Sequence, residues 1–309
     1  MKHLLLLLIL ALTSCAAPAY KPDQRKAPQQ AAHARHEENR ITTPDGTTLF
    51  HQTWLPRFTE ARAVFVMVHG LKDYGDRYAQ TAGELAKAGY AVHAADLRGH
   101  GDSSGDRVWV DSFQQYLDDL DLVLQNVRKQ HPNKRIFLFG HSMGGAIVTL
   151  YTIQKQPNLA GMVLSAPALG KYNVSGFKAG ATNVFGSISP TLAVFSLDDE
   201  KFSRDPKVVA DMKTDPLIYH GAAPARTAKE LLGAFTPIQE KMETIQVPIL
   251  CLHGTADELT NPQGCKDLVK RASSKDKTLN LYPGLFHDLL HEPEKDKVLG
   301  DLLAWLKRH

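Results

Sequence analysis

Short apolar runs alternate with amphipathic stretches over most of this chain. Residues 63–68 (Ala-Val-Phe-Val-Met-Val) form a continuous apolar run, which is typical of a strand buried on both faces. Residues 113–129 instead place their apolar side chains on one face of a helix. The same two patterns predict further strands at 48–55, 90–95, 135–139, 162–165, 248–252 and 278–282, and further helices at 77–88, 146–154 and 296–307. This alternation predicts an α/β fold with a mostly parallel sheet covered by helices on both faces.

Residues from 168 to about 235 interrupt the alternation. They contain no clear buried strand, but apolar patches with several glycines run from 174 to 195. We therefore expect a helical cap inserted into the α/β unit.

The first 40 residues have a different composition. Lys2 precedes an apolar run at 4–12, which is too short to span a bilayer and is typical of a secretory signal. Residues 16–40 are rich in Pro, Ala, Gln and charged side chains and show no apolar periodicity. This composition predicts a flexible tether, followed by a folded domain over 41–309.

The end of the signal resembles a lipobox. In bacterial lipoproteins such a sequence, here Leu12-Thr13-Ser14-Cys15, ends in the cysteine that becomes the lipidated first residue. The resemblance implies a signal peptide over 1–15 and a membrane anchor on Cys15 at the bacterial cell envelope. Ala16, rather than an aspartate, follows the cysteine, which favours the outer membrane if the cell is Gram-negative. The alternative is an ordinary signal peptide with an incidental cysteine.

Charge and cysteine content exclude several classes of partner. Lys plus Arg number 36 against 33 Asp plus Glu, so the net charge of +3 carries no polyanion-binding signature, and we expect no nucleic-acid partner. The three cysteines match no zinc spacing, so no metal site is expected. Cys251 and Cys265 are expected to be free thiols, and stability to come from packing.

Residues 140–145 (Gly-His-Ser-Met-Gly-Gly) contain the pattern G-x-S-x-G in the context that a nucleophilic serine needs. A predicted strand leads in and a predicted helix leads out, and glycines on both sides of Ser142 relieve crowding in a sharp strand-to-helix turn. The serine hydroxyl then lies at a helix N-terminus, where the dipole favours developing negative charge. Ser142 is the expected nucleophile.

A serine hydroxyl needs a base, and the base needs an orienting acid. In this strand-turn-helix context the chain order is serine, acid, histidine. Asp257 and His287 each follow a predicted strand, so both fit. His291 is the nearest rival base, but it lies at the start of the last helical segment; Glu258 and Asp288 are the rival acids.

Acylation and deacylation both pass through a tetrahedral oxyanion, which requires preorganised N–H donors. The backbone of Met143, directly after the nucleophile, is one expected donor. The other is the backbone N–H of Leu71, in the loop after the strand at 63–68. His69 is expected to support that loop.

At this point the chain resembles the monoglyceride lipase and lysophospholipase group of α/β-hydrolases. The resemblance extends from about residue 42 to 306 and rests on His69-Gly70, Arg77-Tyr78, Asp96 to Ser103, Gly140 to Gly145, Asp215-Pro216-Leu217, Gly254 to Asp257, and Tyr282-Pro283-Gly284 with His287. It implies the α/β-hydrolase fold, an apolar cap over an acyl tunnel, hydrolysis of a single-chain glyceride ester, and no cofactor. Two departures concern head-group preference: Lys72-Asp73-Tyr74 replaces a Gly-Glu-His run, and Thr260 replaces a familiar cysteine.

The leading hypothesis is therefore a serine carboxylic ester hydrolase that acts on monoacylglycerols or related lysolipids. Apolar cap residues are candidate acyl contacts, although ordinary core packing explains such a stripe as often. These candidates are Phe177, Val184, Phe185, Ile188, Leu192 and Phe195.

Two rival functions stay open. A serine aminopeptidase of the same fold would need an acidic group for the substrate amine, which Asp199 or Glu200 could supply. A non-catalytic lipid-binding protein is the second rival, although an intact triad argues against it. Haloalkane dehalogenation is disfavoured, since its nucleophile would be an aspartate.

Overall fold

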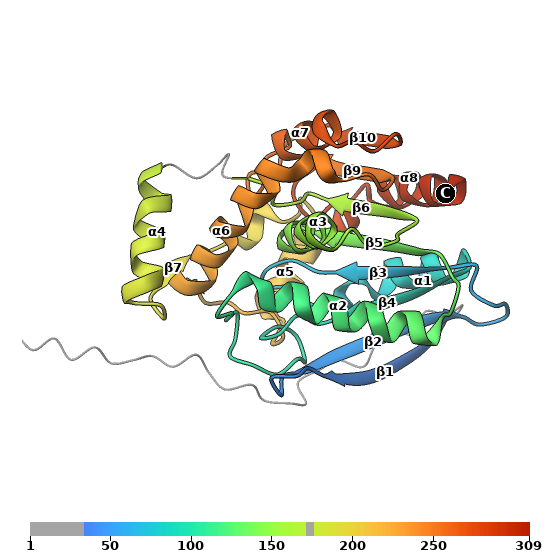
Figure 1. Ribbon diagram of the computed structural model, residues 1–309, viewed down its shortest axis with the longest axis horizontal. Helices are drawn as coiled ribbons and strands as arrows, with labels where there is room; N and C mark the ends of the chain where they lie inside the picture. Colours follow the sequence, from blue (N-terminus) through green and yellow to red (C-terminus); the bar gives the residue numbers. More distant parts are fainter. Residues whose placement is uncertain (1–33, 171–175) are drawn as a thin grey trace, which may run out of the picture.

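A mostly parallel sheet forms the centre of the molecule, in agreement with the predicted fold (Figure 1). The computed structural model describes residues 34–170 and 176–309 and, except at residues 176–179 and 195, their side chains. The strands lie in the order β1-β2-β4-β3-β5-β6-β9-β10; β2 is antiparallel to both its neighbours, β1 and β4, and the other neighbouring strands pair in parallel. Their bounds are β1 Ala34–Thr42, β2 Thr48–Pro56, β3 Ala63–Val68, β4 Tyr90–Ala95, β5 Ile136–His141, β6 Gly161–Ser165, β9 Ile249–Gly254 and β10 Lys277–Tyr282.

Helices cover both faces of this sheet because alternate strand residues point to opposite sides. Val64 and Val66 of β3 pack with one set of helices, whereas Phe65 and Met67 pack with the other. The first set comprises α2 (Phe113–Gln130), α3 (Met143–Lys155), α6 (Ala225–Lys241) and α7 (Gln263–Arg271). The second comprises α1 (Ala79–Lys87), which follows the short helix η1 (Gly75–Tyr78), and α8 (Lys295–Arg308). Each β3 side chain thus belongs to a buried core.

The segment between β6 and β9 forms an insertion that includes α6. Figure 1 shows its helix α4 (Gly176–Ile188) alongside α6. The remaining elements are β7 (Ala193–Phe195), η2 (Asp199–Lys201), α5 (Pro206–Thr214), β8 (Ala223–Pro224) and η3 (Met242–Thr244); η4 (Leu289–His291) precedes α8. Within residues 34–170 and 176–309, no helix combines the length and apolar character that a bilayer span requires.

Residues 34–40, expected to belong to the tether, instead form most of β1. The strand lies at the edge of the sheet and pairs with β2 from Ala34 opposite Pro56 to Thr42 opposite Thr48. Most of its side chains are exposed, so the sequence carries no apolar alternation that would indicate a strand. The signal peptide, Cys15 and the rest of the tether lie outside the described residues.

Cys251 and Cys265, expected to be free, form a disulfide. Cys251 lies in β9 and Cys265 in α7, and the fold brings their Cα atoms to 5.9 Å, within the usual range for a disulfide. A count of cysteines cannot show this proximity, because it depends on how α7 packs beside β9.

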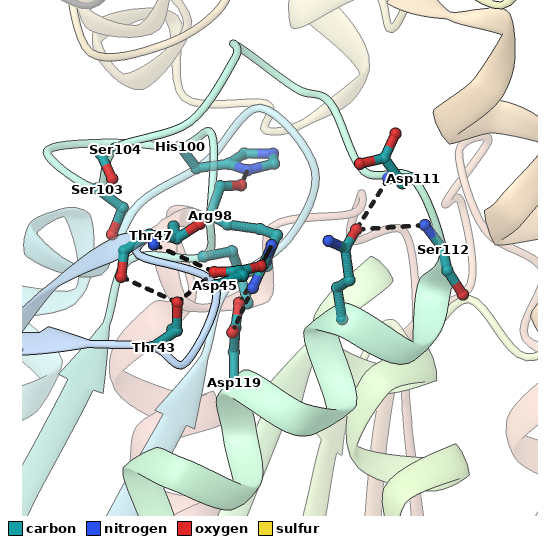
Figure 2. Close-up of polar contacts among 12 residues, drawn as sticks. Thr43, Asp45, Thr47, Arg98, His100, Ser103, Ser104, Asp111, Ser112 and Asp119 are labelled. Atoms are coloured by element: carbon teal, nitrogen blue, oxygen red, sulfur yellow. Dashed lines mark hydrogen bonds and ion pairs between the residues drawn. The ribbon is translucent and has the colours of Figure 1, made fainter.

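A buried arginine ties the loop after β4 to two other parts of the fold (Figure 2). Arg98 binds both carboxylate oxygens of Asp119 in α2, each at 2.7 Å, and donates to Asp45 in the β1–β2 turn at 2.8 Å. A bidentate guanidinium–carboxylate pair fixes both groups, so these contacts attach the loop after β4 to α2.

Candidate active site

The nucleophile elbow is a strained turn between β5 and α3. Ser142 has φ +54° and ψ −119°, a conformation that costs a side-chain-bearing residue about 1–3 kcal/mol. Positions 140 and 144 require glycine because a side chain has no room there. A Cβ on Gly140 would lie 2.5 Å from the Gly144 carbonyl oxygen, and a Cβ on Gly144 would lie 2.2 Å from the Val68 carbonyl oxygen. The turn therefore presents Ser142 at the start of α3, as the sequence motif predicts.

The structure brings the predicted acid and base together. Asp257 follows β9 and His287 follows β10, and Asp257 Oδ2 lies 2.8 Å from His287 Nδ1. An ionised carboxylate only accepts hydrogen bonds, so Nδ1 carries the proton and Nε2 keeps its lone pair. Ser142 and His287 line the same cavity.

Several donors hold Asp257 as a carboxylate. Its Oδ1 accepts the backbone N–H groups of Leu259 at 2.8 Å and Thr260 at 3.0 Å, and its Oδ2 accepts the Thr260 hydroxyl at 2.8 Å. His253 Nε2 lies 3.1 Å from the same Oδ2. Burial alone would raise the pKa of Asp257, but His287 and His253, through charge and hydrogen bonding, hold it well below the usual aspartate range. Thr260, which departs from the family pattern, is thus a partner of the acid.

Negative charge also surrounds the base. Burial alone would lower the pKa of the His287 imidazole, but the carboxylates of Asp257, Asp288 and Asp73 outweigh that effect and raise it. The ring centroids of His141 and His287 lie 4.7 Å apart. Sequence reasoning missed Asp73, because a carboxylate that acts through space leaves no motif.

The rival base and acid have other partners. His291 Nδ1 lies 2.8 Å from Asp288 Oδ1, and its Nε2 lies 2.8 Å from the backbone oxygen of Arg77. Asp288 binds the Arg77 guanidinium with its other oxygen at 2.9 Å. The third rival, Glu258, forms an ion pair with Lys201.

The loop after β3 passes directly beside the nucleophile. A Cβ on Gly70 would lie 3.1 Å from Ser142 Cβ, and Leu71 lines the cavity together with Met143, the first residue of α3. His69 supports this loop: its Nδ1–H donates to the Gly70 carbonyl oxygen at 2.8 Å, and its Nε2 accepts the Leu97 N–H at 2.8 Å. The two predicted oxyanion donors therefore belong to segments that flank Ser142.

A cavity of about 690 Å³ extends from Ser142 and His287 into the cap. Of the predicted acyl contacts, Phe185 and Leu192 line it. Val184 and Ile188 do not; they lie four residues apart on α4 and are 55% and 73% exposed, because this face of the helix points away from the cavity. The side chains of Phe177 and Phe195 lie outside the described residues. Further apolar lining, not predicted from the sequence, comes from Leu71, Leu169, Val194, Leu197, Ala228, Leu231, Leu232, Phe235 and Leu259.

Comparisons with known proteins agree with this geometry. A family profile described as "Serine aminopeptidase, S33" matches residues 59–294, a range that contains the triad and the cap. The chain is 36% identical over 265 residues to a protein named monoacylglycerol lipase from Mycolicibacterium smegmatis, covering 85% of this chain and 94% of that one. It is 32% identical over 288 residues to the monoglyceride lipase of Homo sapiens, covering 92% and 94%. A crystal structure of Paleococcus ferrophilus monoacylglycerol lipase matches with TM-score 0.75 and 30% identity, covering 84% and 98%.

Proposed function

The chain belongs to the monoglyceride lipase family of α/β-hydrolases, and we propose that it hydrolyses monoacylglycerols or related lysolipids through an acyl-enzyme on Ser142. The observation that carries this proposal is the position of the triad. Ser142 and His287 lie in the wall of a cavity whose lining is otherwise mainly aliphatic and aromatic. A volume of about 690 Å³ falls within the range of small-molecule sites, which is about 300–1,000 Å³.

The first half of the reaction would transfer the acyl chain. His287 Nε2 takes the proton of Ser142 as the hydroxyl oxygen attacks the ester carbonyl carbon. The oxyanion that forms accepts hydrogen bonds from the backbone N–H groups of Leu71 and Met143. When the intermediate collapses, the carbon–oxygen bond to glycerol breaks and the imidazolium of His287 returns its proton to the leaving oxygen.

The second half would release the fatty acid. His287 Nε2 takes a proton from a water molecule as the water oxygen attacks the acyl carbonyl, and the same N–H groups hold the second oxyanion. Collapse breaks the bond to Ser142, which regains its proton from His287. Throughout, Asp257 orients the ring through Nδ1 and stabilises the imidazolium.

The aminopeptidase alternative needs a free acidic group at the cavity, and the part of the chain that the structure describes places none there. Glu200 forms an ion pair with Lys213 at 2.9 Å, and neither residue lines the cavity. Glu258 is the acidic residue among the described lining residues, and it is paired with Lys201. A substrate amine would therefore have to displace a lysine.

We also propose that the enzyme is anchored at a bacterial cell envelope by lipidation of Cys15. The support is the lipobox-like sequence at 12–15 and the polar segment that follows it. Several acyl chains on one residue would give stable anchoring, and the anchor would keep the site close to membrane lipids. In cells fed a labelled fatty acid, we expect the wild-type protein to carry the label in the membrane fraction and the Cys15→Ser variant to remain unlabelled. Equal labelling of both proteins would refute the anchor.

The substrate class is tested by comparing a monoacylglycerol, a lysophospholipid and an aminoacyl amide with the purified protein. We expect release of fatty acid from the lipid esters, and the ratio of the two rates gives the head-group preference. Cleavage of the amide alone would favour the peptidase, and turnover of none of them would favour a lipid-binding protein.

A further inference from the structure

Two histidines share one oxygen of the catalytic carboxylate. His287 Nδ1 lies 2.8 Å from Asp257 Oδ2, and His253 Nε2 lies 3.1 Å from the same atom. The His253 side chain is completely buried in the penultimate position of β9 and does not line the substrate cavity. It can therefore influence the reaction only through the groups that it contacts.

The chemistry of the carboxylate assigns the direction of this hydrogen bond. Asp257 is ionised and can only accept, so His253 carries its proton on Nε2 and donates it. The other nitrogen, Nδ1, lies 3.4 Å from Cys265 Sγ. A disulfide sulfur has no proton to offer and is a weak acceptor. The oxygens near Nε2, Asp257 Oδ2 at 3.1 Å and the Thr260 carbonyl oxygen at 3.4 Å, therefore determine the tautomer of His253.

The disulfide holds the same loop at both ends. Cys251 lies two residues before His253 in β9, and Cys265 lies in the first turn of α7. The cross-link therefore closes a segment with a sequence separation of 14 that contains both His253 and Asp257. Both cysteines are completely buried, and Cys265 Sγ contacts the imidazole.

We propose that His253 is a positioning residue of the triad, which holds Asp257 Oδ2 toward His287 and is itself held in place by the Cys251–Cys265 disulfide. The proposal builds on the triad of the proposed function. Without the His253 donor, Asp257 Oδ2 keeps Thr260 and His287 but loses one of its three partners, while Oδ1 keeps the N–H groups of Leu259 and Thr260. Misplacement of a catalytic group by about 1 Å can cost about 100-fold in rate, so we expect kcat to fall by about 10- to 100-fold.

The test compares His253→Leu, which removes the donor, with His253→Gln, which keeps an N–H donor of similar reach. His93→Leu is the matched control, because His93 is also completely buried but contacts Thr53, His51 and His131, away from the triad. Two quantities are measured: kcat and KM per folded enzyme, and the far-downfield proton resonance of His287 Nδ1–H.

In His253→Leu we expect a lower kcat, an unchanged KM and a shifted or broadened resonance. His253→Gln should recover most of the kcat and of the signal, and His93→Leu should change neither. An unchanged kcat and resonance in His253→Leu would overturn the proposal, and so would an equal loss in His253→Gln, which would indicate a purely space-filling role.

The disulfide is tested by the double variant Cys251→Ala/Cys265→Ala. We expect a several-fold lower kcat, an unchanged KM and a broadened resonance. If kcat and the resonance keep their wild-type values, the disulfide does not hold His253 in place. The resonance does not require turnover. If the wild type shows the resonance but hydrolyses no lipid ester, the proposed function fails while the role of His253 is still decided by the variants.

Discussion

The ring of Phe202 stands edge-on to the imidazole of His287, with ring centroids 5.6 Å apart. Phe202 follows η2 in the cap, and its backbone oxygen accepts the N–H of Asp288 at 2.7 Å. The next cap residues extend the contact: Ser203 Oγ donates to the His291 carbonyl oxygen at 2.9 Å, and Arg204 binds the buried carboxylate of Glu292. The residues after η2 therefore support the loop that carries His287, the proposed base.

This contact predicts that Phe202→Leu lowers kcat by about 3- to 10-fold with little change in KM, because the imidazole loses its edge contact and becomes less well oriented. The volume change is small, so we expect less than about 1.5 kcal/mol of lost stability. Steady-state kinetics on active-site-titrated enzyme measures the effect. Phe58→Leu, at an 82% exposed position, is the control; a Phe202→Leu enzyme with unchanged kcat would show that the contact has no role in orientation.

The charges around His287 predict the acidic limb of the pH profile. Because neighbouring carboxylates raise the pKa of His287, the imidazole becomes protonated, and the enzyme inactive, at a pH above the ordinary value of about 6.5. Asp288→Asn removes one of these charges and should move the midpoint of kcat/KM to lower pH. Asp211→Asn, at an exposed position, should leave it in place. A midpoint that moves upward in Asp288→Asn would contradict this origin of the shift.

Three histidines in contact with one another predict a loss of stability in acid. His93 lies between His51 and His131, with nitrogen–nitrogen distances of 3.2 and 2.9 Å, and burial lowers the pKa of all three. The unfolded chain then binds more protons below pH 6.5, so the free energy of unfolding falls as the pH drops. Burial lowers the pKa of His51 to about 4. Its protonation in the unfolded chain alone lowers the free energy of unfolding by up to about 3 kcal/mol as the pH falls from 6.5 to 4.

Urea unfolding between pH 7.5 and 4.5 measures this dependence. His51→Phe should flatten it, whereas His220→Asn, at an exposed position, should not. The same pH slope in His51→Phe and in the wild type would place the acid sensitivity elsewhere.

The disulfide predicts sensitivity to reductants. In the chain-entropy description, closure of a loop of about 15 residues stabilises the fold by about 3 kcal/mol. A phosphine reductant should therefore lower the melting temperature of the wild type and leave that of Cys251→Ala/Cys265→Ala unchanged. Equal melting curves for the wild type with and without reductant, under conditions where both thiols become alkylated, would contradict this contribution.

The strand-to-helix turn at Ser142 and the positions of Asp257 and His287 just after strands were predictable from the sequence, because each depends on a local signal. A strand followed by a crowded turn with glycines marks Ser142, and polar residues just after apolar runs mark Asp257 and His287. The buried strands were predictable for the same reason, since continuous apolar runs rarely occur elsewhere.

Features that depend on packing were not predictable. β1 is polar on both faces because it lies at an edge, and the acyl-cavity residues of α6, such as Leu231 and Phe235, have the same periodicity as core residues. The partners of Asp257 come from β9, from the loop that follows it and from the loop after β10, and only the fold shows that they converge. The Cys251–Cys265 bond likewise depends on the packing of α7 beside β9.

The most direct measurement is the release of fatty acid from a medium-chain monoacylglycerol by the wild type and by Ser142→Ala, at equal concentrations of folded protein. We expect turnover by the wild type and a rate at least about a thousandfold lower in the variant, because removal of a serine nucleophile abolishes acyl-enzyme formation. Hydrolysis by Ser142→Ala at the wild-type rate, or no ester hydrolysis by the wild type, would contradict a serine hydrolase that acts through Ser142.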